Sequence, residues 1–122
     1  MLSGQGSFVT SIILYYSDHG QVIYENPQRP DYYEHEVSRP GVTIPLMVYF
    51  SPSMRQQHPE LYEQVLAAKD RKIMADLIAN SVLGLLGVKV KYYNPRLDFF
   101  SPSYDTTRPR VIKGYDGTTI EL

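Results

Sequence analysis

The motif Ser17-Asp18-His19-Gly20 carries the side chains best suited to chemistry in this chain. Asp18 and His19 offer an oxygen and a nitrogen ligand on one short stretch of backbone, the donor types that suit zinc or manganese. Gly20 allows a sharp turn or the close approach of a ligand. The alternative is structural: Asp18 then caps a turn, and His19 is a surface residue.

The run before this motif predicts where the motif lies. Residues 8–16 are almost uncharged and rich in β-branched and aromatic side chains, as expected of a strand buried on both faces of a parallel sheet. Ligands bind at the carboxyl ends of strands in open α/β sheets. The motif therefore follows the strand at the point where a metal or phosphate site would be built.

Three other positions in the sequence are weaker candidates. His35 lies in a polar segment about 16 residues after His19, where it is either a further ligand, a phosphate-orienting group or part of a solvated loop. His58 precedes Pro59 at an expected helix start, and we expect it on the surface. Arg108 and Arg110 either pair with an anionic group or form an exposed basic spot. The exposed spot is favoured, because the flanking residues form no obvious pocket.

Composition excludes several classes of protein. The chain has 122 residues and a net charge of −1. It therefore lacks the excess of basic residues that would indicate a nucleic-acid partner. It has 11 Tyr. It has no Cys, and this excludes disulfides and thiolate metal sites. No apolar run reaches the roughly 18–20 residues that span a bilayer. The first six residues lack a basic region, so we expect no export signal.

The pattern of residues predicts an α/β fold in which 1–122 form one partial domain. Ser51-Pro52-Ser53 is expected to be a turn, Gly84 a site of close packing and Gly87 a helix C-terminal cap. The sequence contains too few other strands to cover the first strand, which suggests that the chain is part of a larger domain. The expected elements are a strand at 7–16, a long loop at 20–41, a strand at 42–50, a helical region at 59–87 and a hairpin at 111–120.

Several segments together resemble the bacterial phosphoethanolamine transferases, sulfatase-like members of the alkaline phosphatase superfamily. Their order along the chain matches the family over roughly residues 8–112. The segments that carry this resemblance are Ser17-Asp18-His19-Gly20, the His-containing segment 35–39, the Ile-Pro strand 43–49, the Leu-Leu-Gly helix 76–88 and the closing segment 104–112.

The resemblance implies a fold, a cofactor and a reaction. The chain would be the C-terminal portion of a sulfatase-like sheet with flanking helices and a terminal hairpin. Zinc would be held by Asp18 and His19, and His35 would bind the phosphoryl group or a second metal. The reaction would transfer phosphoethanolamine from phosphatidylethanolamine to lipopolysaccharide or a periplasmic glucan, at the periplasmic face of the inner membrane.

Departures from the family pattern limit this expectation. The nucleophilic Thr and the early acidic ligand of the family have no counterpart here, and Gln21 stands where the family usually has Glu. We therefore expect a fragment that binds zinc weakly and is inactive alone. One alternative is a fragment of a sulfatase or phosphodiesterase. The other is a non-catalytic interaction domain that associates through its Tyr-rich surface, with exposed strand edges that favour self-association.

Overall fold

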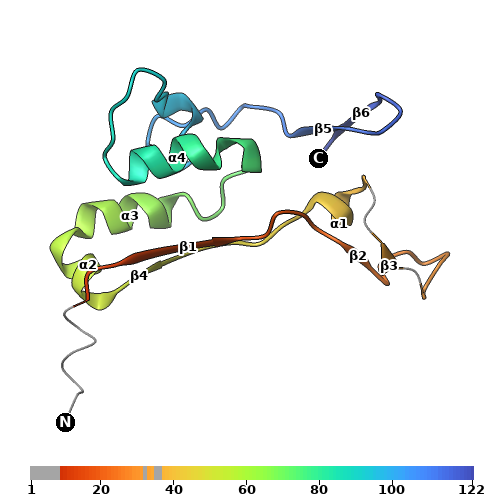
Figure 1. Cartoon of the computed structure of the whole chain (residues 1–122), viewed down its shortest axis with the longest axis horizontal. Helices are drawn as coiled ribbons and strands as arrows, with labels where there is room; N and C mark the ends of the chain where they lie inside the picture. Colours follow the sequence, from red (N-terminus) through yellow and green to blue (C-terminus); the bar gives the residue numbers. More distant parts are fainter. Residues whose placement is uncertain (1–8, 32, 35–36) are drawn as a thin grey trace, which may run out of the picture. The chain divides into compact units, whose positions relative to one another are not determined.

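The computed structural model describes residues 9–31, 33–34 and 37–122 (Figure 1). These residues form two compact units, which we treat separately. The helical unit combines the segment up to Ser11 with Phe50–Arg110, and the strand unit combines Ile12–Tyr49 with Val111–Leu122. The sequence-based assignment of 1–122 to one partial domain stays a prediction.

The strand unit contains short paired strands and one helical turn. Strand β1 pairs with β4, β2 with β3, and β5 with β6. The helical turn α1 is capped by the Ser38 hydroxyl, which accepts from the Gly41 N–H. The elements are β1 (Ile12–Tyr16), β2 (Val22–Ile23), β3 (Tyr33–Glu34), α1 (Arg39–Val42), β4 (Leu46–Phe50), β5 (Val111–Lys113) and β6 (Thr119–Glu121).

Strands β1 and β4 correct the expectation of a parallel sheet buried on both faces. The Ser51 N–H, just after β4, donates to the carbonyl of Ser11, just before β1, at 3.0 Å. The two strands therefore run in opposite directions. Ile13 and Tyr15 are 56% and 53% exposed, so one face of β1 is uncovered within this chain. The uncharged run indicated a strand correctly but could not specify which chain segments cover it.

Element boundaries differ from the expected ones at several positions. Of the described residues in the expected strand 7–16, only Ile12–Tyr16 form β1. The expected strand at 42–50 begins only at Leu46, directly after Pro45, which has no N–H to donate to a strand ladder. The expected loop at 20–41 contains β2, β3 and most of α1. At the C-terminal end, the expected hairpin is present, with Ile112 opposite Ile120.

The helical unit begins where a turn was expected. Ser51 caps α2 by accepting from the Met54 N–H, and Pro52 occupies the first turn, where a missing N–H costs no hydrogen bond. The expected helical region at 59–87 is interrupted between Ala67 and Ala75. The elements are α2 (Pro52–Gln57), α3 (Pro59–Ala67), η2 (Ala75–Leu77), α4 (Ile78–Leu85) and η3 (Pro95–Leu97).

Aromatic residues form much of the buried interior of the helical unit. The Phe99 and Phe100 rings meet edge to face with centroids 4.6 Å apart, and both residues are buried. Tyr104 is also buried, and its hydroxyl donates to the Lys72 carbonyl at 2.8 Å. The Arg71 guanidinium donates to the carbonyl of Phe99 at 3.0 Å, which fixes the segment after η3.

Helix α4 ends in a hydrogen-bonded cap formed around Gly87. The Val88 N–H donates to the Leu83 carbonyl at 2.9 Å, and the Gly87 N–H donates to the Gly84 carbonyl at 3.0 Å. Gly87 has φ +68°, the left-handed conformation that this motif requires. The structure therefore confirms the sequence prediction that Gly87 caps this helix.

A buried carboxylate packs directly against α4. Asp98 is 1% exposed, and its oxygens accept from the Tyr93 hydroxyl at 2.7 Å and the Phe100 N–H at 2.9 Å. A Cβ on Gly84 would lie 1.9 Å from Asp98 Oδ2. The prediction of close packing at Gly84 is thus confirmed, and its partner is this carboxylate.

We predict that Gly84→Ala destabilises the protein by about 1–3 kcal/mol, because the added methyl displaces Asp98 from its donors. Helix propensity alone predicts the opposite, a gain of about 1 kcal/mol. Chemical denaturation measures the difference. The control is Ala79→Gly at an exposed position of the same helix, where only propensity acts and a loss of about 1 kcal/mol is expected. A stabilised Gly84→Ala variant would contradict this account.

Tyr93 provides a pH-dependent test of the same contact. Burial, followed by the hydrogen bond to Asp98 and its charge, raises the pKa of Tyr93 from 10.0 to about 12. The neutral phenol therefore favours the folded state, and this contribution is full below about pH 10 and lost as the pH rises through about 12. We expect Tyr93→Phe to flatten the fall in stability over this range, whereas Tyr92→Phe leaves it steep. Equal slopes for both variants would exclude this role for Tyr93.

Candidate functional site

Asp18 and His19 lie in a tight turn directly after β1. The Ser17 hydroxyl donates to the His19 carbonyl at 2.8 Å, and the His19 N–H donates to Asp18 Oδ1 at 3.0 Å. Asp18 thus bonds the backbone of the next residue, as the turn-capping alternative requires. The same bonds hold both side chains on one short segment, so the structural role and ligation are compatible.

Gly20 fixes this turn against the segment around α1. Gly20 is buried, and a Cβ at this position would lie 2.6 Å from the Thr43 carbonyl oxygen and 2.7 Å from that of Gly41. The close approach expected of Gly20 is therefore to backbone carbonyls of this chain. Only glycine allows this distance, which sets where the Asp18–His19 turn lies in the strand unit.

The candidate ligand atoms of Asp18 and His19 lie slightly farther apart than two ligands of one tetrahedral zinc ion. His19 Nε2 and Asp18 Oδ1 are 3.7 Å apart. Two ligand atoms of one tetrahedral zinc, each about 2.0–2.2 Å from the metal, lie roughly 3.3–3.6 Å apart. The other ring nitrogen, Nδ1, is 2.9 Å from the Gly20 carbonyl. An N–H at Nδ1 would donate to that carbonyl and leave the lone pair on Nε2, the usual arrangement of a metal-binding histidine.

The residues that the structure describes do not bring three candidate metal ligands together. His19 and Asp18 side chains are 56% and 86% exposed. Within the described part of the chain, no group of three or more His, Cys, Asp or Glu side chains could hold a metal. His35 lies outside the described residues, so its role as a ligand or phosphate-binding group stays a prediction.

Arg108 differs from its expected role. Its guanidinium contacts Asp76 through both terminal nitrogens, at 2.7 and 3.4 Å. The hydrogen bond to Asp76 raises the pKa of Arg108. Arg108 is therefore an ion-pair partner, and the expectation of an exposed basic spot is wrong for this residue. The acidic partner lies 32 residues earlier, too distant for local sequence reasoning.

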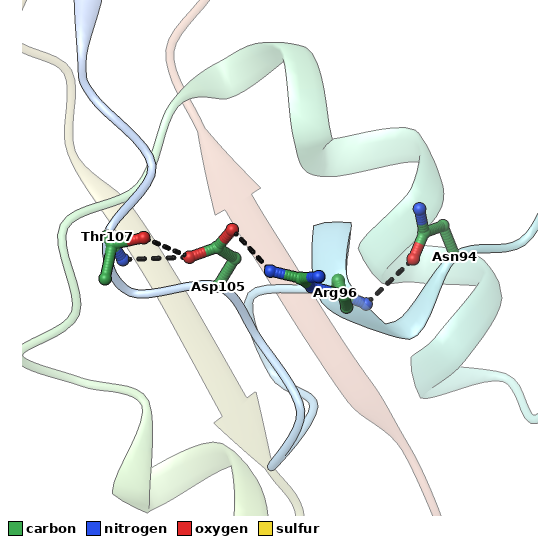
Figure 2. A network of polar contacts seen from close by, with 4 residues as sticks. All are labelled: Asn94, Arg96, Asp105 and Thr107. Atoms are coloured by element: carbon green, nitrogen blue, oxygen red, sulfur yellow. Dashed lines mark hydrogen bonds and ion pairs between the residues drawn. The ribbon is translucent and has the colours of Figure 1, made fainter.

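A second polar network around η3 was also missed from the sequence (Figure 2). Arg96 donates to Asp105 Oδ2 at 3.0 Å, and Asp105 Oδ1 accepts from the Thr107 N–H and hydroxyl. These Thr107 bonds are the main cause of the lowered pKa of Asp105. The Asn94 side chain caps η3 by accepting from the Arg96 N–H. The Asn-Pro pair at 94–95 was the available signal, because a capping side chain followed by proline is typical of a helix start.

Comparison with known proteins decides the family. The model of the Sulfatase family matches residues 2–88, more than half of the chain. The chain belongs to the Sulfatase family. The resemblance to sulfatase-like phosphoethanolamine transferases is also confirmed, because the chain is 28% identical over 99 residues to phosphoethanolamine transferase CptA of Salmonella typhimurium strain LT2. That match covers 79% of this chain and 17% of CptA.

A solved structure supports the fold. The C-terminal periplasmic domain of EptC from Escherichia coli matches 90% of this chain and 31% of that domain chain, with a TM-score of 0.73 and 23% identity. This Sulfatase-family chain thus has the mixed α/β fold of part of that domain. In the part of the chain that the structure describes, no helix is long and apolar enough to cross a membrane.

We predict that Gly20→Ala destabilises the strand unit by about 1–3 kcal/mol, because a methyl cannot fit against the Thr43 and Gly41 carbonyls. Amide hydrogen exchange at Thr43, whose N–H donates to the Arg39 carbonyl, should speed up with the loss of stability. Gln21→Ala, at the next position, is the control and should leave exchange at Thr43 unchanged. Unaltered exchange in Gly20→Ala would show that this close contact does not fix the turn.

Proposed function

We propose that this chain contributes the Asp18–His19 half of the metal site of a zinc-dependent phosphoethanolamine transferase. The observation that carries the proposal is the 3.7 Å separation of His19 Nε2 and Asp18 Oδ1, in a chain of the Sulfatase family. The similarity to CptA favours a transferase over a sulfatase or phosphodiesterase fragment. In this proposal, both units belong to one partial sulfatase-like domain.

The chain's own residues would hold and orient the metal. Asp18 and His19 would be the ligands, and the Gly20 carbonyl would set the tautomer of His19. A bound zinc would neutralise charge on the transferring phosphoryl group and lower the pKa of the attacking hydroxyl. His35 would bind the phosphoryl group or a second metal.

The substrates and setting follow from the resemblance. Phosphatidylethanolamine would be the donor, and lipopolysaccharide or a periplasmic glucan the acceptor, at the periplasmic face of the inner membrane. The hydroxyl nucleophile and further ligands would come from outside the described residues. Because structural zinc sites use four protein ligands and catalytic sites use three, two ligands bind zinc weakly, and we expect no transfer by this chain alone.

One structural observation favours a second candidate, a non-catalytic interaction domain. One face of the β1–β4 pair exposes large apolar side chains from alternate positions of both strands. They are Ile13, Tyr15, Met47 and Tyr49. Such a face, together with open strand edges, is suited to association with another chain or with a second copy.

Zinc titration by calorimetry separates the two candidates. We expect the chain to bind about one zinc ion. His19→Ala or Asp18→Ala should weaken zinc binding by about tenfold or more, because losing even a residue that only hydrogen-bonds to a metal ligand lowers metal affinity about 10–100-fold. Both side chains are more than half exposed, so these variants should fold as the original chain does.

The control is His58→Ala, which removes an exposed histidine at the start of α3. This variant should bind zinc as the unaltered chain does. Equal weakening by His19→Ala and His58→Ala would indicate adventitious binding. No binding above background would favour the interaction domain. Robust metal-dependent transfer by the chain alone would refute the expected inactivity.

A further inference from the structure

The segment between α4 and η3 exposes apolar and basic side chains together. All seven residues of 86–92, which we call the 86–92 loop, are exposed. Figure 1 shows this segment as an open loop that follows α4. Its large apolar residues are Leu86, Val88, Val90 and Tyr92, of which Leu86 is 69% and Tyr92 84% exposed. Lys89 and Lys91 alternate with them.

Both ends of the 86–92 loop are held by hydrogen bonds. At its start, the Gly87 cap ties Val88 to the Leu83 carbonyl at 2.9 Å. At its end, the Asn94 N–H donates to Asn80 Oδ1 at 3.0 Å, and the Asn80 amide donates to the Asn94 carbonyl at 2.8 Å. The exposed side chains are therefore presented from a fixed base on α4.

The positive charge of the 86–92 loop is not neutralised by the nearby acidic residues. Among the described residues, the ion pairs involve other cations, and Lys91 lies 5.9 Å from the centre of the Tyr92 ring. Asp105 pairs with Arg96, and Asp98 is buried against Tyr93. The loop thus carries two cationic groups beside four apolar ones.

We propose that the 86–92 loop binds the surface of a membrane containing anionic lipids. The apolar side chains enter the interfacial region, Tyr92 lies at the boundary between headgroups and acyl chains, and the two lysines contact lipid phosphates. Four apolar side chains on one loop are far fewer than the roughly 20–30 residues on each side of a specific protein interface. Membrane docking needs only a few such anchors next to cationic residues, which favours a lipid partner.

The first test measures co-sedimentation of the unaltered chain with vesicles. We expect binding to vesicles of phosphatidylglycerol and phosphatidylcholine, and much weaker binding to phosphatidylcholine alone. The double variant Lys89→Gln/Lys91→Gln should reduce partitioning by about 25-fold, because each basic residue near an anionic surface contributes about fivefold. The control, Lys69→Gln/Lys72→Gln, removes the same charge from exposed positions elsewhere in the helical unit and should retain most of the binding.

The second test locates the contact. The chain has no Trp, so a single introduced Trp reports its own surroundings. Tyr92→Trp should show a blue-shifted emission with anionic vesicles, whereas Tyr115→Trp, at a residue that is 95% exposed, should not. Binding should persist with a metal chelator, because the proposal does not depend on the zinc site.

Three results would overturn the proposal. They are an absence of binding to anionic vesicles, an equal loss of binding in the two lysine double variants, and an unchanged emission from Tyr92→Trp in vesicles that bind the chain. The second result would mean that net charge alone drives the association. The third would mean that another surface contacts the lipid.

Discussion

The burial of the Asp98 carboxylate is the constraint on which the helical unit depends. A carboxylate removed from water is costly unless it is hydrogen-bonded, and here the Tyr93 hydroxyl and the Phe100 N–H supply those bonds. The same carboxylate occupies the space that a side chain at position 84 would need. Glycine within α4, which weakens a helix locally, is thus required by the polar group packed against it.

The Asp18–His19 turn depends on a similar use of glycine. Gly20 approaches the carbonyls of Gly41 and Thr43 within a distance that no larger residue allows. Because the two candidate ligands are adjacent in the chain, their separation is set by local bonds of the turn rather than by long-range packing. In the proposed zinc site the remaining ligands would come from more distant residues, so the pair alone would supply only part of the chemistry.

Local patterns in the sequence predicted features that local geometry determines. Gly87 as a cap, Gly84 as a close contact and the hairpin at 111–120 all follow from the conformational needs of a few neighbouring residues. One proline led to a wrong local prediction. Ser51-Pro52-Ser53 suggested a turn, whereas Pro52 follows the capping side chain of Ser51 and begins α2.

Contacts between distant residues could not be predicted in the same way. Nothing near Arg108 in the sequence identifies Asp76 as its partner. The apolar run before Asp18 correctly indicated a strand, but its burial depends on segments that pack over it. A run of apolar residues indicates that its side chains tend to be buried, but it does not identify the segment that packs against them. Zinc ligation by Asp18 and His19 remains a prediction because further ligands would come from distant residues, and the role of His35 remains one because His35 lies outside the described residues.

The exposed face of β1 and β4 has a consequence for the behaviour of the chain in solution. In the described residues β1 pairs only with β4, and neither Ile12–Tyr16 nor Leu46–Phe50 contains a charged residue or a proline. Short uncharged strands of this kind are prone to stack into ordered fibrils, because charged gatekeeper residues are absent from them. We therefore expect association between copies of this chain to begin at these strands as its concentration rises, independently of the free energy that holds each unit folded.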